Sequence, residues 1–222
     1  MDIKTWLQQK NLVFDGAMGT MLQRRGLKPG GLPELLNLTD PALVLGIHQD
    51  YVAAGADVVS TNTFQANRFK LAHCGHSVEE IIRSGVGLAK QSGARFVALD
   101  VGPLGQLLEP MGTLKWEDAY DAYREIVTAG ERAGADLILF ETMADPYEVK
   151  AGILAAKEQT SLPIFATLTY QEDGRTFVGT DPVTGTLLLQ SLGVDAVGVN
   201  CSMGPEELTP VVQTIQIGRA HV

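Results

Sequence analysis

The fold is decided by a short unit that is clearest in Ala133-Gly134-Ala135-Asp136-Leu137-Ile138. A segment with helical periodicity meets a glycine, then one small apolar residue, one charged residue and an apolar run of strand-forming side chains. This order predicts a helix that ends on a left-handed glycine, followed by a tight turn into a strand. The same unit recurs at residues 54–59, 92–97 and 192–197.

Two further apolar segments complete the set of predicted strands. Pro163 introduces the run 164–169, and residues 12–14 form a short strand near the start of the chain. The six predicted strands are apolar without alternation, which is typical of parallel strands covered on both faces. Helical periodicity between them predicts a chain of alternating strands and helices.

Two α/β architectures accommodate this alternation: a doubly wound sheet and a (β/α)8 TIM-type barrel. The first strand-to-helix turn, residues 15–20, lacks a G-x-G-x-x-G loop, which weakens the doubly wound alternative. A complete barrel needs about 250 residues. The sequence of 222 residues therefore predicts a barrel truncated after about six βα units, with an incomplete domain over residues 1–216 and an irregular tail over 217–222.

Composition narrows the classes of function. The net charge of -9 and the scattered positions of the 17 Lys and Arg residues argue against nucleic acid as a partner. No apolar run reaches the ~18 residues that span a bilayer, and no signal peptide is recognisable, so we expect a cytoplasmic protein with no membrane partner. The two cysteines, Cys74 and Cys201, predict no disulfide framework.

The predicted strands all run into small, polar or acidic residues. These strand ends are Asp15-Gly16, Thr61-Asn62-Thr63, Asp100-Val101-Gly102, Glu141-Thr142, Thr167 to Tyr170 and Asn200-Cys201. The carboxyl ends of parallel strands meet at one edge, and this edge carries the active site in βα barrels. The sequence therefore predicts a polar cleft at that edge.

Each strand-end residue also has a structural interpretation. Asp15 and Asp100 precede glycine-containing turns and are typical turn residues. Glu141 follows a buried apolar run, where a charge without a partner is costly, and this favours ligand binding over a structural ion pair. Asn62 and Asn200 fit either ligand binding or a tie between loops, and the sequence does not separate the two.

Cysteine, histidine and lysine positions bear on the chemistry. Cys201 at the sheet edge is a candidate metal ligand, whereas Cys74 lies in a polar turn and is interpreted as part of a helix end. His48 is expected on the outward face of its helix. None of the lysines falls in a predicted strand, which argues against an aldolase that needs a strand lysine for a Schiff base.

Taken together, the motifs resemble the homocysteine S-methyltransferase family. They are Phe14 to Thr20 (FDGAMGT), Glu34 to Asn37 (ELLN), Gly55 to Asp57 (GAD), Ser60 to Phe64 (STNTF), Phe140 to Met143 (FETM) and Gly198 to Cys201 (GVNC). The resemblance covers residues 10 to about 213. Within the family it is closest to the N-terminal homocysteine-binding modules of cobalamin-dependent methionine synthases.

The resemblance implies a barrel that binds zinc through three cysteine thiolates and transfers a methyl group to the thiol of homocysteine, giving methionine. Cys201 matches the first zinc ligand and is the expected catalytic residue. The other two ligands belong to a Gly-Gly-Cys-Cys motif that this sequence does not contain, so the chain by itself is expected to be inactive. Zinc would lower the pKa of the homocysteine thiol so that a thiolate is available for methyl transfer.

The resemblance also assigns the substrate contacts. Asp15 and Glu141 match acidic residues that hold the amino group of homocysteine. The backbone amides of the turn Gly16-Ala17-Met18-Gly19 would receive its carboxylate. Methylcobalamin is the implied methyl donor, replenished from methyltetrahydrofolate by cobalamin- and folate-binding modules outside this chain, although S-methylmethionine and betaine serve other members of the family.

Two other hypotheses stay open at this point. The chain is alternatively a non-catalytic barrel fragment that binds an amino acid or acts as a scaffold, because a single thiolate is a poor zinc site. A third hypothesis is a different barrel enzyme that uses Glu141 as a general base without zinc.

Overall fold

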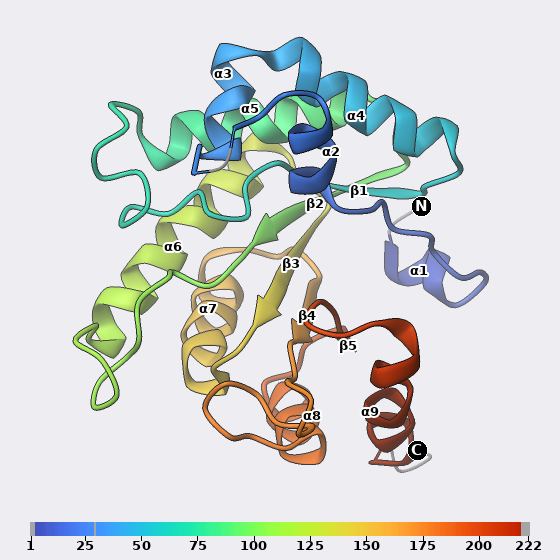
Figure 1. Ribbon diagram of the computed structural model, residues 1–222, viewed down its shortest axis with the longest axis vertical. Coiled ribbons are helices and arrows are strands. Elements are labelled where there is room, and N and C mark those ends of the chain that lie inside the picture. Colours follow the sequence, from blue (N-terminus) through green and yellow to red (C-terminus); the bar gives the residue numbers. More distant parts are fainter. Residues whose placement is uncertain (1–2, 29, 219–222) are drawn as a thin grey trace.

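A parallel sheet forms the centre of the molecule. The computed structural model describes residues 3–28 and 30–218, and in it five strands pair in sequence order without a reversal (Figure 1). The strands are β1 (Val58–Ser60), β2 (Phe96–Val101), β3 (Leu137–Met143), β4 (Ile164–Leu168) and β5 (Ala196–Val199). An order that never reverses is that of a barrel wall, whereas a doubly wound sheet reverses at a switch point.

The sixth predicted strand, residues 12–14, is reduced to a single parallel bridge between Phe14 and Val58. The amide groups of Asp57 and Val58 both donate to the Val13 carbonyl oxygen, which holds this segment beside β1. On the other side of the sheet, β5 pairs with β4, and no described residue pairs with its outer edge. The described part of the chain is therefore a curved parallel sheet whose two edges are not joined.

Helices cover the outer side of this sheet (Figure 1). The helical elements of the described chain are α1 (Ile3–Leu7), α2 (Met18–Arg24), the 3-10 turn η1 (Pro33–Leu35), α3 (Leu36–Thr39), α4 (Pro41–Ala53), α5 (Val78–Gln91), α6 (Trp116–Ala133), α7 (Pro146–Gln159), α8 (Pro182–Ser191) and α9 (Pro205–Gly218), and of these α1 lies on the inner side. The side chains of Asp40, Asp145 and Asp181 cap the first turns of α4, α7 and α8, each next to a proline at the helix start. No helix in the described ranges is long and apolar enough to cross a membrane.

The predicted irregular tail over residues 217–222 is wrong at its first two positions. Helix α9 continues through Ile217 and Gly218. Residues 219–222 lie outside the part of the chain that the structure describes.

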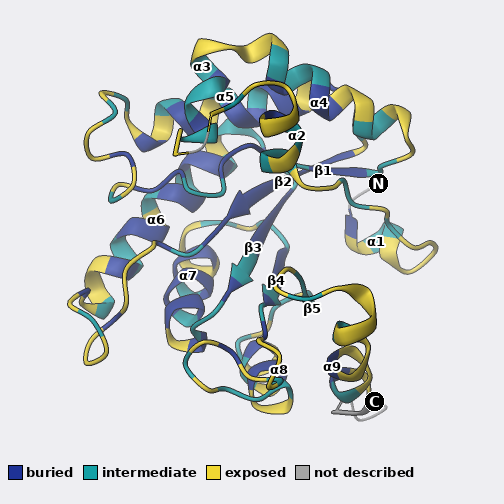
Figure 2. Ribbon diagram, in the orientation of Figure 1, coloured by how far each residue is buried: buried dark blue, intermediate teal, exposed yellow. Residues whose placement is uncertain are grey.

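Two apolar layers lie on opposite faces of the sheet, because successive strand residues belong alternately to one cluster and to the other. The strand β2 and most of β3, at the centre of the sheet, are buried (Figure 2). The outer layer joins the sheet to α5, α6 and α7 and contains the fully buried Tyr123 and Phe140, whose rings meet edge to face at 5.8 Å. The inner layer consists of Val58, Phe96, Ala98, Leu137, Leu139 and Phe165, together with Ile3 from α1. Helix α1 thus covers the inner layer, and Lys4 of that helix pairs at 2.7 Å with Asp195, the residue just before β5.

The repeated unit of the sequence has a clear structural reason. All four of its glycines adopt positive φ angles, from 71° at Gly193 to 107° at Gly55, which confirms the prediction of left-handed glycines before the strands. The aspartate that follows accepts a hydrogen bond from an amide at the start of a neighbouring strand. Asp136 Oδ2 accepts from Val97 N at 2.8 Å, and Asp195 Oδ2 accepts from Ile164 N at 2.8 Å.

Asp57 repeats this contact with Val13 N at 3.2 Å. In the second unit the charged residue is Arg95, whose guanidinium lies 3.9 Å from the centre of a Trp6 ring and 3.8 Å from Asp57. The acidic residue of the unit therefore helps to fix the register between neighbouring strands.

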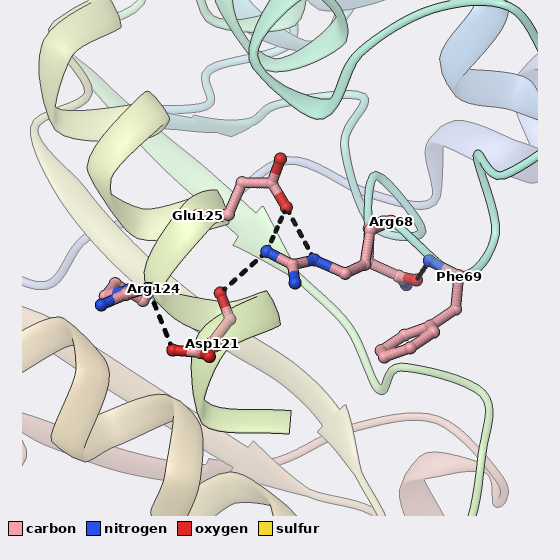
Figure 3. A network of polar contacts seen from close by, with 6 residues as sticks. Arg68, Phe69, Asp121, Arg124 and Glu125 are labelled. Carbon is pink, nitrogen blue, oxygen red and sulfur yellow. Dashed lines mark hydrogen bonds and ion pairs between the residues drawn. The ribbon is translucent and has the colours of Figure 1, made fainter. Parts of the chain in front are cut away.

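The connection between β1 and α5 is anchored to the outer helix layer by Arg68. Its guanidinium donates to Glu125 at 2.9 Å and to the Asp121 carbonyl oxygen at 3.4 Å, while Arg124 pairs with the Asp121 carboxylate at 3.0 Å (Figure 3). These partners lie on α6 and are substantially exposed, so the network orients the connection more than it stabilises the fold.

His48 is fully buried, which corrects the prediction that it faces outward. Both ring nitrogens lack a hydrogen-bond partner among the described residues. Burial lowers the pKa of His48 to about 4, so the ring is neutral in the folded protein at neutral pH. Helix α4 contacts α2, α3 and α5 as well as β1, so it is covered by several elements, which its helical periodicity does not reveal.

We expect His48 to make the protein less stable in mild acid. A folded-state pKa below the ordinary value of 6.5 means that stability is present above that value and is lost as the pH falls toward about 4. The loss at pH 5 amounts to about 2 kcal/mol. Urea unfolding at pH 7.5 and pH 5 should show a smaller acid loss in His48→Leu than in the natural chain, whereas His73→Gln, at an exposed position, should leave it unchanged. Equal acid losses in all three proteins would contradict this expectation.

Candidate functional site

The strand register places one row of polar side chains on the inner face, at the carboxyl ends of the strands. Asp100 pairs with Leu139, Leu139 with Phe165, and Phe165 with Ala196, so these residues face the same way. The inward positions nearest the carboxyl ends are Ser60 and Asp100, then Glu141 and Thr167, two residues after Leu139 and Phe165, and Asn200, four residues after Ala196. The polar cleft predicted at this edge is therefore present.

A cavity of about 290 Å³ opens above the inner apolar layer. Its lining combines apolar side chains, among them Phe14, Leu139 and Phe165, with the polar groups of Asp15, Ser60, Glu141, Thr167 and Asn200. Three of the residues predicted from the sequence, Asp15, Glu141 and Asn200, are thus brought together. An apolar pocket with a few convergent polar groups is the usual form of a small-molecule site.

Asp15 enters the cavity from the segment beside β1. Its Oδ2 atom accepts a hydrogen bond from Ser60 N at 3.0 Å, which fixes the carboxyl group against the end of that strand. Burial raises the pKa of Asp15 to about 7, and the nearby Glu141 adds to the rise, while the Ser60 hydrogen bond opposes it. Asp15 is consequently poised to change its charge near neutral pH.

Asn200 holds Glu141 in place. Its Nδ2 atom donates to Glu141 Oε1 at 2.8 Å and to Thr142 Oγ1 at 2.7 Å. Its Oδ1 atom accepts from Thr167 Oγ1 at 2.8 Å and from Thr142 N at 3.1 Å. Asn200 therefore joins β3, β4 and β5 at the mouth while also lining the cavity, so both interpretations left open by the sequence apply to it.

The backbone next to Glu141 is strained. The pairing of β3 with β4 shifts by one residue between Phe140 and Met143, and Thr142 in this bulge has φ 58°. A β-branched residue in the left-handed region is unfavourable, and such strain is concentrated at functional sites. Cys201 and Ser202 at the end of β5 have φ 59° and 63°.

The strained segments meet at the Cys201 sulfur. Thr142 Oγ1 lies 3.4 Å from Cys201 Sγ, and Asn200 Nδ2 lies at the same distance from it. Cys201 is exposed and free. Its sulfur can thus act as a ligand at the edge of the cavity, next to the residues that orient Glu141.

The described residues fit a zinc site only in part. Cys201 offers one thiolate, the type of donor that zinc prefers. No group of three or more His, Cys, Asp or Glu side chains in residues 3–28 and 30–218 is arranged to hold a metal ion. These residues can supply one ligand and no complete coordination sphere.

The turn from Gly16 to Gly19 lies beside the cavity. A Cβ atom at position 16 would lie 2.9 Å from the Tyr51 hydroxyl, so any larger residue there would have to displace the Tyr51 side chain. Helix α2 begins at Met18 with Ala17 as its N-cap, and no side chain caps it. The first amide groups of this helix therefore have no acceptor within the helix.

Asn62 does not line the cavity. Its Nδ2 group donates to the Pro33 carbonyl oxygen at 2.8 Å and to Asn37 Oδ1 at 3.0 Å, which favours the structural role of joining neighbouring loops. Asp100, interpreted from the sequence as a turn residue, is buried on the inner face. The signal that finds it is the two-residue alternation within β2, where Phe96 and Ala98 already belong to the inner layer.

The fold and the cavity define a class: α/β proteins with a parallel sheet and a cavity at the carboxyl ends of its strands. Within that class, a model of the homocysteine S-methyltransferase family matches residues 12–222, and the chain belongs to this family.

Solved structures and protein sequences that are similar to this chain support the family assignment. The chain is 26% identical to the metallated homocysteine methyltransferase MmuM from Escherichia coli, with a TM-score of 0.83 over 95% of this chain and 81% of that one. It is 32% identical to the methionine synthases of Mycobacterium tuberculosis and Mycobacterium leprae over 94% of its length. It spans 19% of each of those two proteins.

We expect Asn200→Asp to destabilise the protein at neutral pH. Aspartate removes the donor that Glu141 and Thr142 share and places a second carboxylate against Glu141, which should cost about 2 kcal/mol. In acid the new carboxyl group becomes protonated and can donate again, so the loss should shrink. Urea unfolding at pH 7.5 and pH 5 measures both effects, and Asn11→Asp at an exposed position is the control. Identical unfolding midpoints for Asn200→Asp and Asn11→Asp would contradict the bridging role.

Proposed function

We propose that this chain forms the homocysteine-binding part of a zinc-dependent methyltransferase that converts homocysteine to methionine. The observation that carries the proposal is the pairing of two carboxyl groups with an apolar cavity. Asp15 and Glu141 face this cavity, and neither forms an ion pair within the described residues. A buried pair of acids without a cation favours a ligand that brings a positive charge.

An α-amino acid with a short apolar side chain meets these requirements. Its ammonium group would lie between Asp15 and Glu141, which Ser60 N and Asn200 Nδ2 already orient. Its carboxylate would accept hydrogen bonds from the backbone amides of Gly16, Ala17, Met18 and Gly19. Its methylene groups would contact the apolar lining, and its thiol would point toward Cys201.

Cys201 would supply one of the three thiolates of a zinc site, with the other two from residues beyond those described. Zinc bound there would lower the pKa of a coordinated thiol. The role of this chain's own residues is to fix the amino acid, exclude water with the apolar lining, and hold the Cys201 sulfur through Thr142 and Asn200. Closure of the sheet into an eight-stranded barrel belongs to the same proposal.

The methyl donor is proposed to be methylcobalamin, presented by another module and regenerated from methyltetrahydrofolate by a further one. Two methionine synthases, each about five times as long as this chain, support the presence of such modules in relatives. A second function, amino-acid binding without transfer, is favoured by one observation: a single thiolate stands at the mouth in the described part of the chain.

We expect Glu141→Gln and Asp15→Asn each to weaken homocysteine binding by at least about tenfold, because each removes a charged acceptor of the ammonium group. The affinity of the natural chain should rise about tenfold from pH 6 to pH 8, since Asp15, with a pKa of about 7, must be ionised to accept the cation. Asp15→Asn should flatten this pH dependence. Calorimetric titration with homocysteine under reducing conditions measures the affinity of the natural chain, Glu141→Gln and Asp15→Asn. The exposed Asp118→Asn serves as the control. Homocysteine binding that none of these changes affects would overturn the proposed site.

We expect Cys201 to be the metal-binding thiolate of this chain. Cobalt(II) added in place of zinc should give a sulfur-to-metal absorption band in the near ultraviolet, because a thiolate ligand is required for that band. The band should vanish in Cys201→Ser and persist in Cys74→Ser, which removes the other free cysteine. Persistence of the band in Cys201→Ser would contradict the assignment of Cys201 as the metal ligand.

A further inference from the structure

Thr142 follows Glu141 directly on β3, yet both side chains reach the mouth of the cavity. Consecutive side chains of a regular strand point to opposite faces, so Thr142 would face the outer helices if Glu141 lines the cavity. Its Oγ1 atom instead lies 2.7 Å from Asn200 Nδ2 and 3.4 Å from Cys201 Sγ. The register shift of this part of β3 and the φ of 58° at Thr142 turn the side chain toward the mouth, as bulges commonly do.

The direction of these hydrogen bonds follows from the number of hydrogen atoms available. The amide nitrogen of Asn200 carries two, and its two shortest contacts are Thr142 Oγ1 at 2.7 Å and Glu141 Oε1 at 2.8 Å. The Thr142 hydroxyl therefore accepts from Asn200, and its own hydrogen is left for the Cys201 sulfur, its other contact among the described residues. Asn200 Nδ2 also lies 3.4 Å from that sulfur, but both of its hydrogens are already engaged.

The backbone of Thr142 is fixed as well. Its amide lies 3.1 Å from Asn200 Oδ1 and 3.2 Å from Thr167 Oγ1, so neighbouring strands hold the residue in its left-handed conformation. This conformation is unfavourable for a β-branched residue. The hydrogen bonds of the Thr142 amide and hydroxyl therefore offset a strain that aims the hydroxyl at one atom.

The turn that carries Cys201 is held by other contacts. The Cys201 carbonyl accepts from Met203 N at 2.8 Å, and the hydroxyls of Ser202 and Thr169 lie 2.5 Å apart. With the backbone set in this way, the direction of the Cys201 side chain depends on what its sulfur contacts. The donor that remains for the sulfur is the Thr142 hydroxyl.

We propose that Thr142 is a positioning residue whose hydroxyl donates to the Cys201 sulfur and fixes that side chain in one rotamer at the mouth. Because the Asn200 amide group holds both Thr142 and Glu141, the sulfur and the Glu141 carboxylate keep a set separation before any ligand binds. No covalent bond forms or breaks. The single rotamer is a property of the free protein, whereas its use in metal binding rests on the proposed function.

NMR of the full, metal-free chain tests the rotamer directly. In Cys74→Ser, labelled at cysteine, Cys201 is the one labelled residue, and the couplings between its Hα and Hβ atoms report its side-chain torsion. They should have the values of a single rotamer. Thr142→Val in this background keeps the β-branched shape and loses the hydroxyl, so the couplings should average over several rotamers. Thr142→Ser should restore the single rotamer, and Thr209→Val, at an exposed position on α9, should leave it unchanged.

Cobalt(II) titration of the same proteins tests the consequence for metal binding. Thr142→Val should require about fivefold more cobalt(II) to reach half of the sulfur-to-metal band, because the side chain must then be ordered when the metal binds. Thr142→Ser should stay within about twofold of the Cys74→Ser protein. A role limited to folding would not be restored by serine in both measurements.

The outcomes distinguish the two proposals. If Cys74→Ser gives no cobalt band, the proposed metal ligand fails, and the couplings still decide on Thr142. If the band forms but the couplings of Cys74→Ser are averaged, or Thr142→Val keeps a single rotamer, the positioning role fails while the proposed function stands. Equal behaviour of Thr142→Ser and Thr142→Val also overturns it. Should Thr142→Val not fold, Thr142→Ala replaces it, and an averaged rotamer in Thr142→Ser or in Cys74→Ser alone is sufficient to reject the proposal.

Discussion

The whole arrangement depends on the hydrogen bonds that aspartates at the base of the strands make to their neighbours. Asp57, Asp136 and Asp195 each receive an amide from the adjoining strand or segment. Side chains alternate between the two faces of a strand, so a slip by one residue would turn every inward residue outward. A contact at the lower edge of the sheet therefore determines that Asp100, Glu141 and Asn200 face one cavity at the upper edge.

Stability and function oppose each other at that upper edge. The carboxyl groups of Asp15, Asp100 and Glu141 are crowded together without a cation, and the bulge at Thr142 adds backbone strain beside them. Such features lower the stability of the unliganded protein and are retained where a ligand or a neighbouring group compensates them. Asn200 limits this destabilisation, because one side chain satisfies groups on three strands.

Much of this could be predicted from local sequence. Glycine-plus-aspartate units fix the ends of helices and the starts of strands by short-range geometry, so the parallel α/β sheet was predictable, as was the meeting of Asp15, Glu141 and Asn200 at the ends of strands. What could not be predicted depends on contacts between distant segments. Asn62 is tied to Asn37 and Pro33, and α2 and α3 cover the helix that carries His48. The place of Asp100 in the same inward row as Glu141 follows from inter-strand register, which a turn motif does not reveal.

Helix α1 links the two ends of the described chain. Ile3 packs under the inner layer with Phe165, and Lys4 pairs with Asp195, a partner far along the sequence. During synthesis on the ribosome α1 emerges before β4 and β5, which complete its docking surface. A contact between residues so distant in sequence requires closing a long loop, which slows its formation. The floor of the cavity is therefore expected to assemble late in folding, and until then the apolar inner faces of β2 and β3 lack the cover of α1.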